Sequence, residues 1–212
     1  MVPLLPPLKD NKKIYIICEG SEEYDYLNRL KILNVWSDVY DITLRDAKGN
    51  GNLYPIYQNV YQKGNYDLVV IVCDTEKKPH EQFNDICCKV NSLHACELAS
   101  QHVVMFTNPC TMQVILLHWD TSVRLQTPSK RRSATYIEKY TGIQDYSAKE
   151  SQRTQLVSNI TKESYRTMMN GAKQLGMDAA LINSTNLHVF FAQLEQPDTN
   201  WIDEINKLIE SQ

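Results

Sequence analysis

Apolar runs alternate with amphipathic helical stretches over the first half of the chain. Four runs are short and rich in branched apolar residues, as strands are: residues 14–18, 39–44, 68–73 and 102–106. The run at 68–73, LVVIVC, is apolar without interruption, which is typical of a parallel strand covered on both faces. A stretch with apolar residues at helical spacing follows each run after a short connection. This order predicts an α/β fold with an open sheet of about four parallel strands flanked by helices.

The pattern changes at about residue 125. Beyond it we find no clear strand, and helical spacing predicts helices at 135–140, 149–175, 186–194 and 201–209. We therefore expect an α/β core over residues 13–124 and a helical extension over 125–212 that packs on this core. Residues 1–12 contain three prolines and predict a flexible arm.

Composition limits the cellular compartment. The chain has 212 residues, enough for one ordinary domain with an extension, and 42% of them are hydrophobic. No apolar stretch approaches the ~20 residues of a membrane span, and the N-terminus has neither the charged leader nor the apolar run of a signal peptide. The six cysteines form no CxxC pair. We expect a cytoplasmic protein with reduced thiols and no membrane contact.

Two acidic turns come directly after predicted strands. Glu19 ends the first strand, and Glu23 lies four residues on, in the first turn of the next helix. Asp74 and Glu76 follow the strand at 68–73, and in extended backbone they would point the same way. Because sites in open α/β sheets lie at the carboxyl ends of the strands, we expect the four carboxylates to meet. They would suit a Mg²⁺ or Mn²⁺ ion; the alternative is a set of solvated loop acids.

Basic residues gather in the second half, although the net charge of the whole chain is −3. Residues 124–166 hold nine Lys and Arg against four Asp and Glu. A cationic arm beside an acidic metal site suits a nucleic acid, with Lys130, Arg131 and Arg132 holding the phosphate backbone. The alternative is a solvated helical surface. Three interleaved tyrosines suggest either base stacking or, more simply, helix packing: Tyr136, Tyr140 and Tyr146.

Four motifs resemble those of known protein families. IICEGSEEYDYL at 16–27 resembles the first motif of Toprim domains, and CDTE at 73–76 stands in the place of their Asp-x-Asp motif. TNPCTMQVILLHW at 107–119 resembles the Asn-Pro helix signature of RloB-like proteins. NSTNLHVFFAQL at 183–194 is similar to the C-terminal helix of that group. The resemblance covers residues 13–119, with the motifs in the expected order, and then residues 183–194.

The resemblance implies a Toprim-like nuclease fold and a metal-dependent cleavage of DNA or RNA phosphodiesters in bacterial anti-phage defence. It implies that Glu19 is a general acid/base or metal ligand, that Asp74 is the main metal ligand, and that Glu23 is a second one. It also supports a contact of His118 to phosphate or to the metal site, against the simpler role of a core or rim histidine. An ATPase is the partner protein that the resemblance implies, and the sequence leaves a homo-oligomer open.

Two positions depart from the family pattern. Glu76 stands where Toprim domains have Asp, and Gln113 stands where relatives carry an acid. These departures motivate an alternative function, a non-cleaving binding subunit that docks on an ATPase or senses a phage product. Other chemistries have less support: the soft ligands between Cys87 and His102 lack zinc-finger spacing, and KGNGN at 48–52 lacks the Lys-Ser/Thr of a P-loop.

Overall fold

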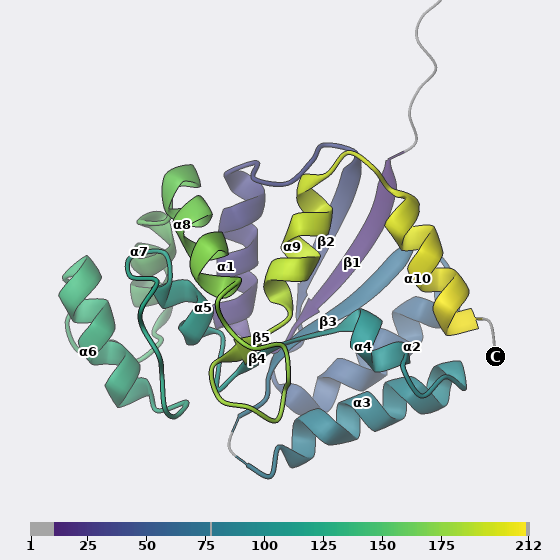
Figure 1. The fold of residues 1–212 in the computed structure, drawn as a ribbon, viewed down its shortest axis with the longest axis horizontal. Coiled ribbons are helices and arrows are strands. Elements are labelled where there is room, and N and C mark those ends of the chain that lie inside the picture. Colours follow the sequence, from purple (N-terminus) through teal and green to yellow (C-terminus); the bar gives the residue numbers. More distant parts are fainter. Residues whose placement is uncertain (1–10, 77, 211–212) are drawn as a thin grey trace, which may run out of the picture.

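The sheet has five strands in the computed structural model, which describes residues 11–76 and 78–210. The strands are β1 (Lys12–Cys18), β2 (Tyr40–Asp46), β3 (Leu68–Asp74), β4 (Val104–Asn108) and β5 (Ser184–Thr185). Their order is β2-β1-β3-β4-β5. The first four run parallel and β5 is antiparallel to β4. The predicted open, mostly parallel α/β sheet is therefore confirmed (Figure 1). Residues 1–10 of the predicted arm lie outside the described residues, and Lys12 already belongs to β1.

Helices cover both faces of the sheet. They are α1 (Ser21–Ile32), α2 (Leu53–Lys63), α3 (Glu81–His94), α4 (Ala99–Val103), α5 (Met112–Leu116), α6 (Lys130–Thr141), α7 (Glu150–Ser158), α8 (Lys162–Ala172), α9 (Leu187–Glu195) and α10 (Asn200–Glu210). A short 3₁₀ turn, η1 (Asn50–Asn52), precedes α2. Right-handed crossovers place α1 on one face and α2 and α3 on the other, and α8 and α9 join α1 (Figure 1). The central strand β3 is buried from Leu68 to Cys73, as its unbroken apolar pattern predicted.

The C-terminal segment contains a strand that the sequence did not predict. Ser184 and Thr185 form β5, which pairs with Asn108 and Thr107 of β4. Next to it, the side chain of Asn186 continues the pairing: Phe106 N donates to Asn186 Oδ1 at 2.7 Å, and Asn186 Nδ2 donates to the carbonyl oxygen of Val104 at 3.0 Å. Two residues are too short for a periodic signal, so the helical prediction for this segment missed β5.

Helix α3 ends earlier than its apolar pattern suggested. The prediction extended the helix to residue 99, but Ala95 adopts a left-handed conformation, with φ of 50°, and terminates it after His94. The short helix α4 then takes up the first part of the predicted strand at 102–106, so β4 starts at Val104. No helix within the described parts of the chain is both long and apolar enough to cross a membrane.

A candidate acidic active site

The parallel register brings the acidic turns to one edge of the sheet. Cys18 aligns with Asp46 on one side and with Val72 on the other. Asp74 aligns with Thr107 of β4. Four strands therefore end together, and the residues after them, or the last residues within them, share the carboxyl edge. In Figure 1 this edge lies toward the lower centre of the view, where β1 and β3 end.

Glu19 joins the ends of β1 and β3. Its backbone N–H donates to the carbonyl oxygen of Val72 at 3.0 Å, and its Oε2 accepts from the backbone N–H of Asp74 at 3.0 Å. Burial raises the pKa of Glu19 above its usual value and the charge of Glu76 adds to this, while the Asp74 N–H and the Asn50 amide oppose the rise. The carboxylate thus bridges two strand ends and remains harder to ionise than a surface glutamate.

Glu23 is buried in the first turn of α1. Its Oε2 accepts a hydrogen bond from Gly20 N at 2.9 Å, which satisfies a free N–H at the start of the helix. Burial, together with the negative charges of Glu19 and Glu22, raises its pKa from 4.5 to about 7. Gly20 has extended backbone, with φ of −146°, so the turn does not itself demand a glycine. A Cβ at this position would lie 3.4 Å from Glu23 Oε2.

Asp74 is held by hydroxyl and amide donors. Its Oδ1 accepts from Thr107 Oγ1 at 3.1 Å and from Thr111 at two atoms, N at 2.7 Å and Oγ1 at 2.8 Å. Burial raises the pKa of Asp74 well above its usual range, and the charges of Glu23 and Glu19 raise it further, although the Thr111 bonds oppose this. The three carboxyls Glu19, Glu23 and Asp74 are therefore electrostatically coupled. Thr107 and Thr111 are site residues that the sequence prediction missed.

Glu76 does not belong to this buried group. The strand ends at Asp74, and Glu76 has a positive φ of 56°, so the extended geometry that would align the two side chains is absent. Its side chain is exposed, yet its charge still raises the pKa of Glu19. The prediction of extended backbone from Asp74 to Glu76 is therefore wrong, because the backbone turns at Glu76.

The loop after β2 forms a further wall of the site. Asp46 Oδ2 accepts from Ser21 Oγ at 2.8 Å, and Gly49 N donates to the carbonyl oxygen of Glu19 at 2.8 Å. Asn50 Nδ2 is buried here without a hydrogen bond of good geometry. The KGNGN segment is thus packed against the acidic turn rather than being only a flexible connection. Asp46 is the last residue of β2, and Arg45 separates it from the apolar run predicted at 39–44.

Two residues of the TNPCTMQVILLHW segment have structural partners. Gln113 is fully buried; its Nε2 donates to the carbonyl oxygen of Val123 and its Oε1 accepts from Leu125 N. His118 is buried between α1 and α8, with Nε2 at 3.1 Å from Tyr26 Oη and Nδ1 at 3.0 Å from Ser164 Oγ. Burial lowers the pKa of His118 to about 3, so it stays neutral. Both nitrogens are occupied, and we do not retain the phosphate contact expected of His118.

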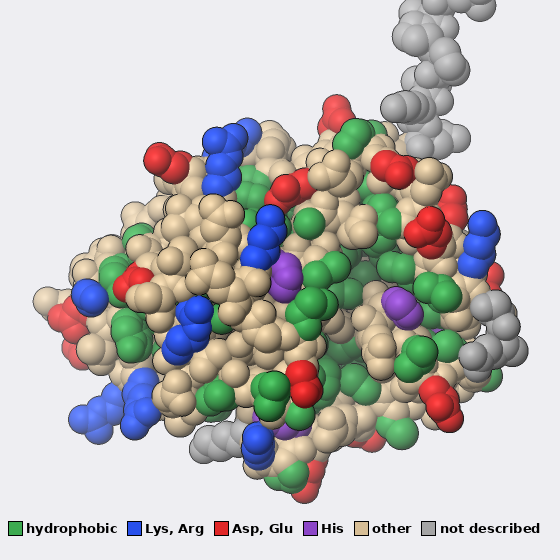
Figure 2. All heavy atoms as spheres, in the orientation of Figure 1, with side chains coloured by type: hydrophobic (Ala, Val, Ile, Leu, Met, Phe, Trp, Pro, Cys, Tyr) green, Lys and Arg blue, Asp and Glu red, His purple; other side chains and the backbone are tan. Residues whose placement is uncertain are grey.

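The predicted basic residues lie at the start of α6. Arg131 and Arg132 are exposed there, and Lys130 opens the helix, although its side chain is outside the described part of the structure. Figure 2 shows Lys and Arg side chains gathered over this end of α6. Among the tyrosines, Tyr146 is buried with its hydroxyl donating to Glu22 Oε1 at 2.9 Å, which is a packing role.

The carboxyl oxygens of the acidic edge are suitable ligands for a hard divalent cation, but they are not arranged around one point. The charges of Glu19 and Glu23 raise the pKa of Asp74, the charge of Glu19 raises that of Glu23, and a cation would relieve this repulsion. Yet within the described residues no group of three or more His, Cys, Asp or Glu side chains is arranged to hold a metal ion. Glu19 and Asp74, with Glu23, are the residues that would hold one. The soft cluster around Cys87 also forms no such group there.

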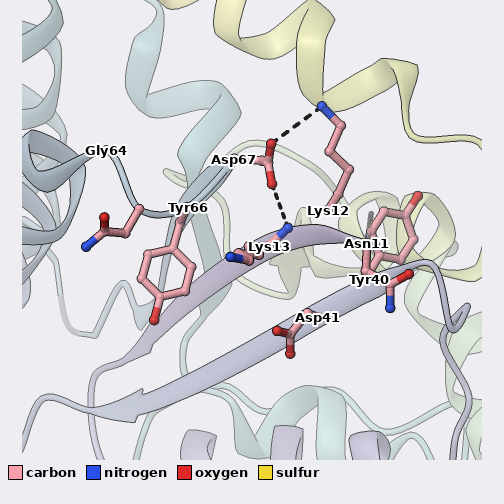
Figure 3. A pocket seen from close by; sticks show the side chains of 9 residues that line it. Asn11, Lys12, Lys13, Tyr40, Asp41, Gly64, Tyr66 and Asp67 are labelled. Atoms are coloured by element: carbon pink, nitrogen blue, oxygen red, sulfur yellow. Dashed lines mark hydrogen bonds and ion pairs between the residues drawn. The ribbon is translucent and has the colours of Figure 1, made fainter. Parts of the chain in front are cut away.

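A pocket lies at the opposite end of the strands from the acidic edge. It has a volume of about 710 Å³ and is lined by residues at the starts of β1 and β2 and by the turn before β3 (Figure 3). Asp67 dominates it, accepting from Lys13 N at 2.7 Å and pairing with Lys12 Nζ at 3.5 Å. These groups satisfy one another and brace the strand starts, so size alone does not make this pocket the functional site.

The fold and the acidic edge define an α/β protein with an open, mostly parallel sheet and coupled carboxyls at the ends of β1 and β3. The model of the RloB-like protein family matches residues 14–211, nearly the whole chain. The chain therefore belongs to the RloB-like family, as its motifs predicted. No curated protein and no solved structure matches it.

Proposed function

We propose that the protein is a metal-dependent nuclease that cleaves phosphodiester bonds in DNA or RNA at the acidic edge, in bacterial anti-phage defence. One observation carries the proposal: Asp74 ends β3, and the charges of Glu19 and Glu23, which follow the neighbouring strand β1, raise its pKa, while Glu19 accepts the backbone N–H of Asp74 at 3.0 Å. Buried like charges are costly, and proteins retain them mainly at functional sites. The Toprim-like arrangement of the motifs agrees with this chemistry.

The proposed roles follow from the contacts of each carboxyl. A bound Mg²⁺ or Mn²⁺ would polarise a phosphoryl oxygen and stabilise the charge on the leaving oxygen. Asp74, fixed by Thr107 and Thr111, offers a rigid carboxylate to such an ion. Glu19 supplies the second carboxylate from the end of the neighbouring strand β1, and its hydrogen bond from Asp74 N orients it. Glu23, with a pKa of about 7, can accept or return a proton near neutral pH.

The test is cleavage of plasmid DNA and of transfer RNA in the presence of Mg²⁺ or Mn²⁺. The variants Glu19→Gln and Asp74→Asn keep the shape of the side chains and remove their charge. We expect each to lose activity by a factor of about 10²–10⁴, the usual contribution of a positioned acid–base group. Asp41→Asn removes an exposed charge from β2 and serves as the matched control, with activity unchanged.

The outcomes separate the enzyme from a contaminant. If wild type and both variants cleave equally well, the acidic edge is not the catalytic site. If the wild type cleaves neither nucleic acid with either metal, the proposed activity is refuted. Melting temperatures of all four proteins show whether a loss of activity reflects a loss of folding.

A second function is supported by the geometry of the same edge. The described residues hold no preformed group of three metal-binding side chains, and Glu76 is exposed rather than buried with the other carboxyls. These observations favour a member of the family that keeps the fold, does not cleave, and docks on an ATPase or senses a phage product. The two functions differ in whether the acidic edge binds a divalent cation.

A further inference from the structure

A groove along α8 combines exposed cations with little opposing charge. It has a volume of about 490 Å³ and lies between α8, the end of α9 and the loop after α1. Lys162, Arg166 and Lys173 line one side of it. They are 4 and 11 residues apart, so the helical repeat of 3.6 places all three on one face. Figure 2 shows Lys and Arg side chains over and beside α8.

The three cations are free to meet a ligand. All are exposed, and in the part of the chain that the structure describes none of them forms an ion pair. Glu195 is the single acid among the lining residues, and its Oε1 already accepts the Tyr165 hydroxyl at 2.7 Å. The pKa of the neighbouring His188 is lowered by burial and further by the charge of Lys173. The lining therefore carries three cations against one carboxylate, which leaves it with a net positive charge.

The start of α8 is held firmly in position. Arg29 of α1 donates from Nη2 to the carbonyl oxygen of Ile160 at 2.7 Å and to that of Ser158 at 3.2 Å. Thr161 caps the helix, accepting from Ser164 N at 3.1 Å. Gly171 allows α8 to approach the loop at Thr121 closely, since a Cβ there would lie 3.1 Å from the Thr121 side chain. The cations are thus presented on a fixed helix rather than on a mobile loop.

We propose that this groove binds the phosphodiester backbone of a nucleic acid, as an anchoring surface separate from the acidic edge. Eleven residues of helix separate Lys162 from Lys173 by about 16 Å, too far for one small anion to bridge. Successive phosphates of one strand, spaced about 3.4 Å apart along a duplex axis, extend over such a length. Asn34 and Asn170 add amide donors to the lining. Contacts of this kind position a nucleic acid without reading its sequence.

The groove and the acidic edge lie at opposite ends of α1. The acidic turn precedes the first residue of this helix, whereas Asn34 and Val35 of the groove follow its last. Twelve helical residues put the Asn34–Val35 end of the groove roughly 18 Å from the acidic turn along the axis of α1. The link from anchoring to cleavage rests on the proposed nuclease function; the anchoring itself does not.

The experiment measures binding with cleavage disabled. The full-length protein carrying Asp74→Asn, in EDTA, is titrated against fluorescent 20-nucleotide single strands and duplexes of DNA and RNA, with anisotropy as the readout. The groove variant combines K162E, R166E and K173E. The control variant combines K13E, K63E and K207E, three exposed lysines elsewhere that give the same change of net charge. Vesicles rich in anionic lipid and free inorganic phosphate are titrated in parallel.

We expect the groove variant to bind nucleic acid at least tenfold more weakly, whereas the control variant loses less than threefold. The slope of log K against log salt should fall by about two to three for the groove variant, since three phosphate contacts are lost. Equal losses in both variants, or no binding by the parent, would overturn the proposal. Loss of vesicle or phosphate binding with nucleic-acid binding intact would overturn it too. If the groove binds as expected but the wild type cleaves no nucleic acid with Mg²⁺ or Mn²⁺, only the nuclease function is refuted.

Discussion

The ionisation of Glu23 makes the stability of the fold depend on pH. Its pKa rises from 4.5 to about 7, first because it is buried and then because of the charges of Glu19 and Glu22. A carboxyl with a raised folded-state pKa binds more protons in the folded than in the unfolded protein. The charged form of Glu23 therefore destabilises the fold. That cost is absent below about pH 4.5, grows between pH 4.5 and 7, and is fully present above.

The variant Glu23→Gln tests this cost directly. Gln keeps an oxygen that can accept from Gly20 N but has no charge. At pH 8 we expect the variant to be more stable than wild type by about 1–3 kcal/mol, and at pH 4 we expect the difference to disappear. Urea unfolding at both pH values measures it. A variant that is less stable than wild type at pH 8 would show that the charge of Glu23 stabilises the fold.

Single residues also show how far the sequence predicts the site. Glu19 and Asp74 were identified because each directly follows an apolar strand, and parallel strands share their carboxyl edge. Thr107, Thr111 and Asp46 were missed because their roles depend on which strands are neighbours. His118 and Gln113 lie in a motif with family resemblance, but their partners lie outside it: Ser164 for His118, and Leu125 for Gln113.

Among the structural elements, the edge of β4 is paired in part by a side chain: the Asn186 amide continues the hydrogen bonding that β5 begins. Asn186 accepts from Phe106 N and donates to the Val104 carbonyl, and Thr185 Oγ1 donates to the carbonyl oxygen of Phe106 at 2.7 Å. A short strand of two residues is thus extended by an amide. This closes an edge that would otherwise present free backbone groups.

Removing that amide should destabilise the sheet. Asn186→Ala leaves Phe106 N and the Val104 carbonyl without their partner, and we expect a loss of about 1–3 kcal/mol in the free energy of unfolding. Asn59→Ala changes an exposed residue of α2 and is the control, with a change of less than about 0.5 kcal/mol. Thermal or urea unfolding measures both. Equal stabilities of the two variants would show that Asn186 does not support the edge.

Elements with a long periodic pattern were predictable, and those set by local backbone geometry were not. The four parallel strands and the helices between them follow from hydrophobic spacing. The end of α3 depends instead on the left-handed Ala95, and β5 depends on pairing with a strand some 80 residues earlier. Neither leaves a periodic signal in the sequence.

The whole molecule separates two surfaces of opposite charge. Coupled carboxyls lie at the carboxyl edge of the sheet, and the cationic groove lies at the far end of α1. The net charge of −3 conceals this division. A nucleic acid held by the groove would be anchored away from the acidic edge, so the two surfaces can be tested by separate substitutions.

The most direct measurement of the proposed chemistry is anomalous diffraction from a crystal soaked in millimolar MnCl₂. The predicted result is a manganese peak coordinated by Glu19 and Asp74 that disappears in Asp74→Asn crystals grown and soaked identically. A soaked wild-type crystal with this edge open to solvent and no manganese there would contradict a metal-dependent nuclease and favour the non-cleaving binding subunit.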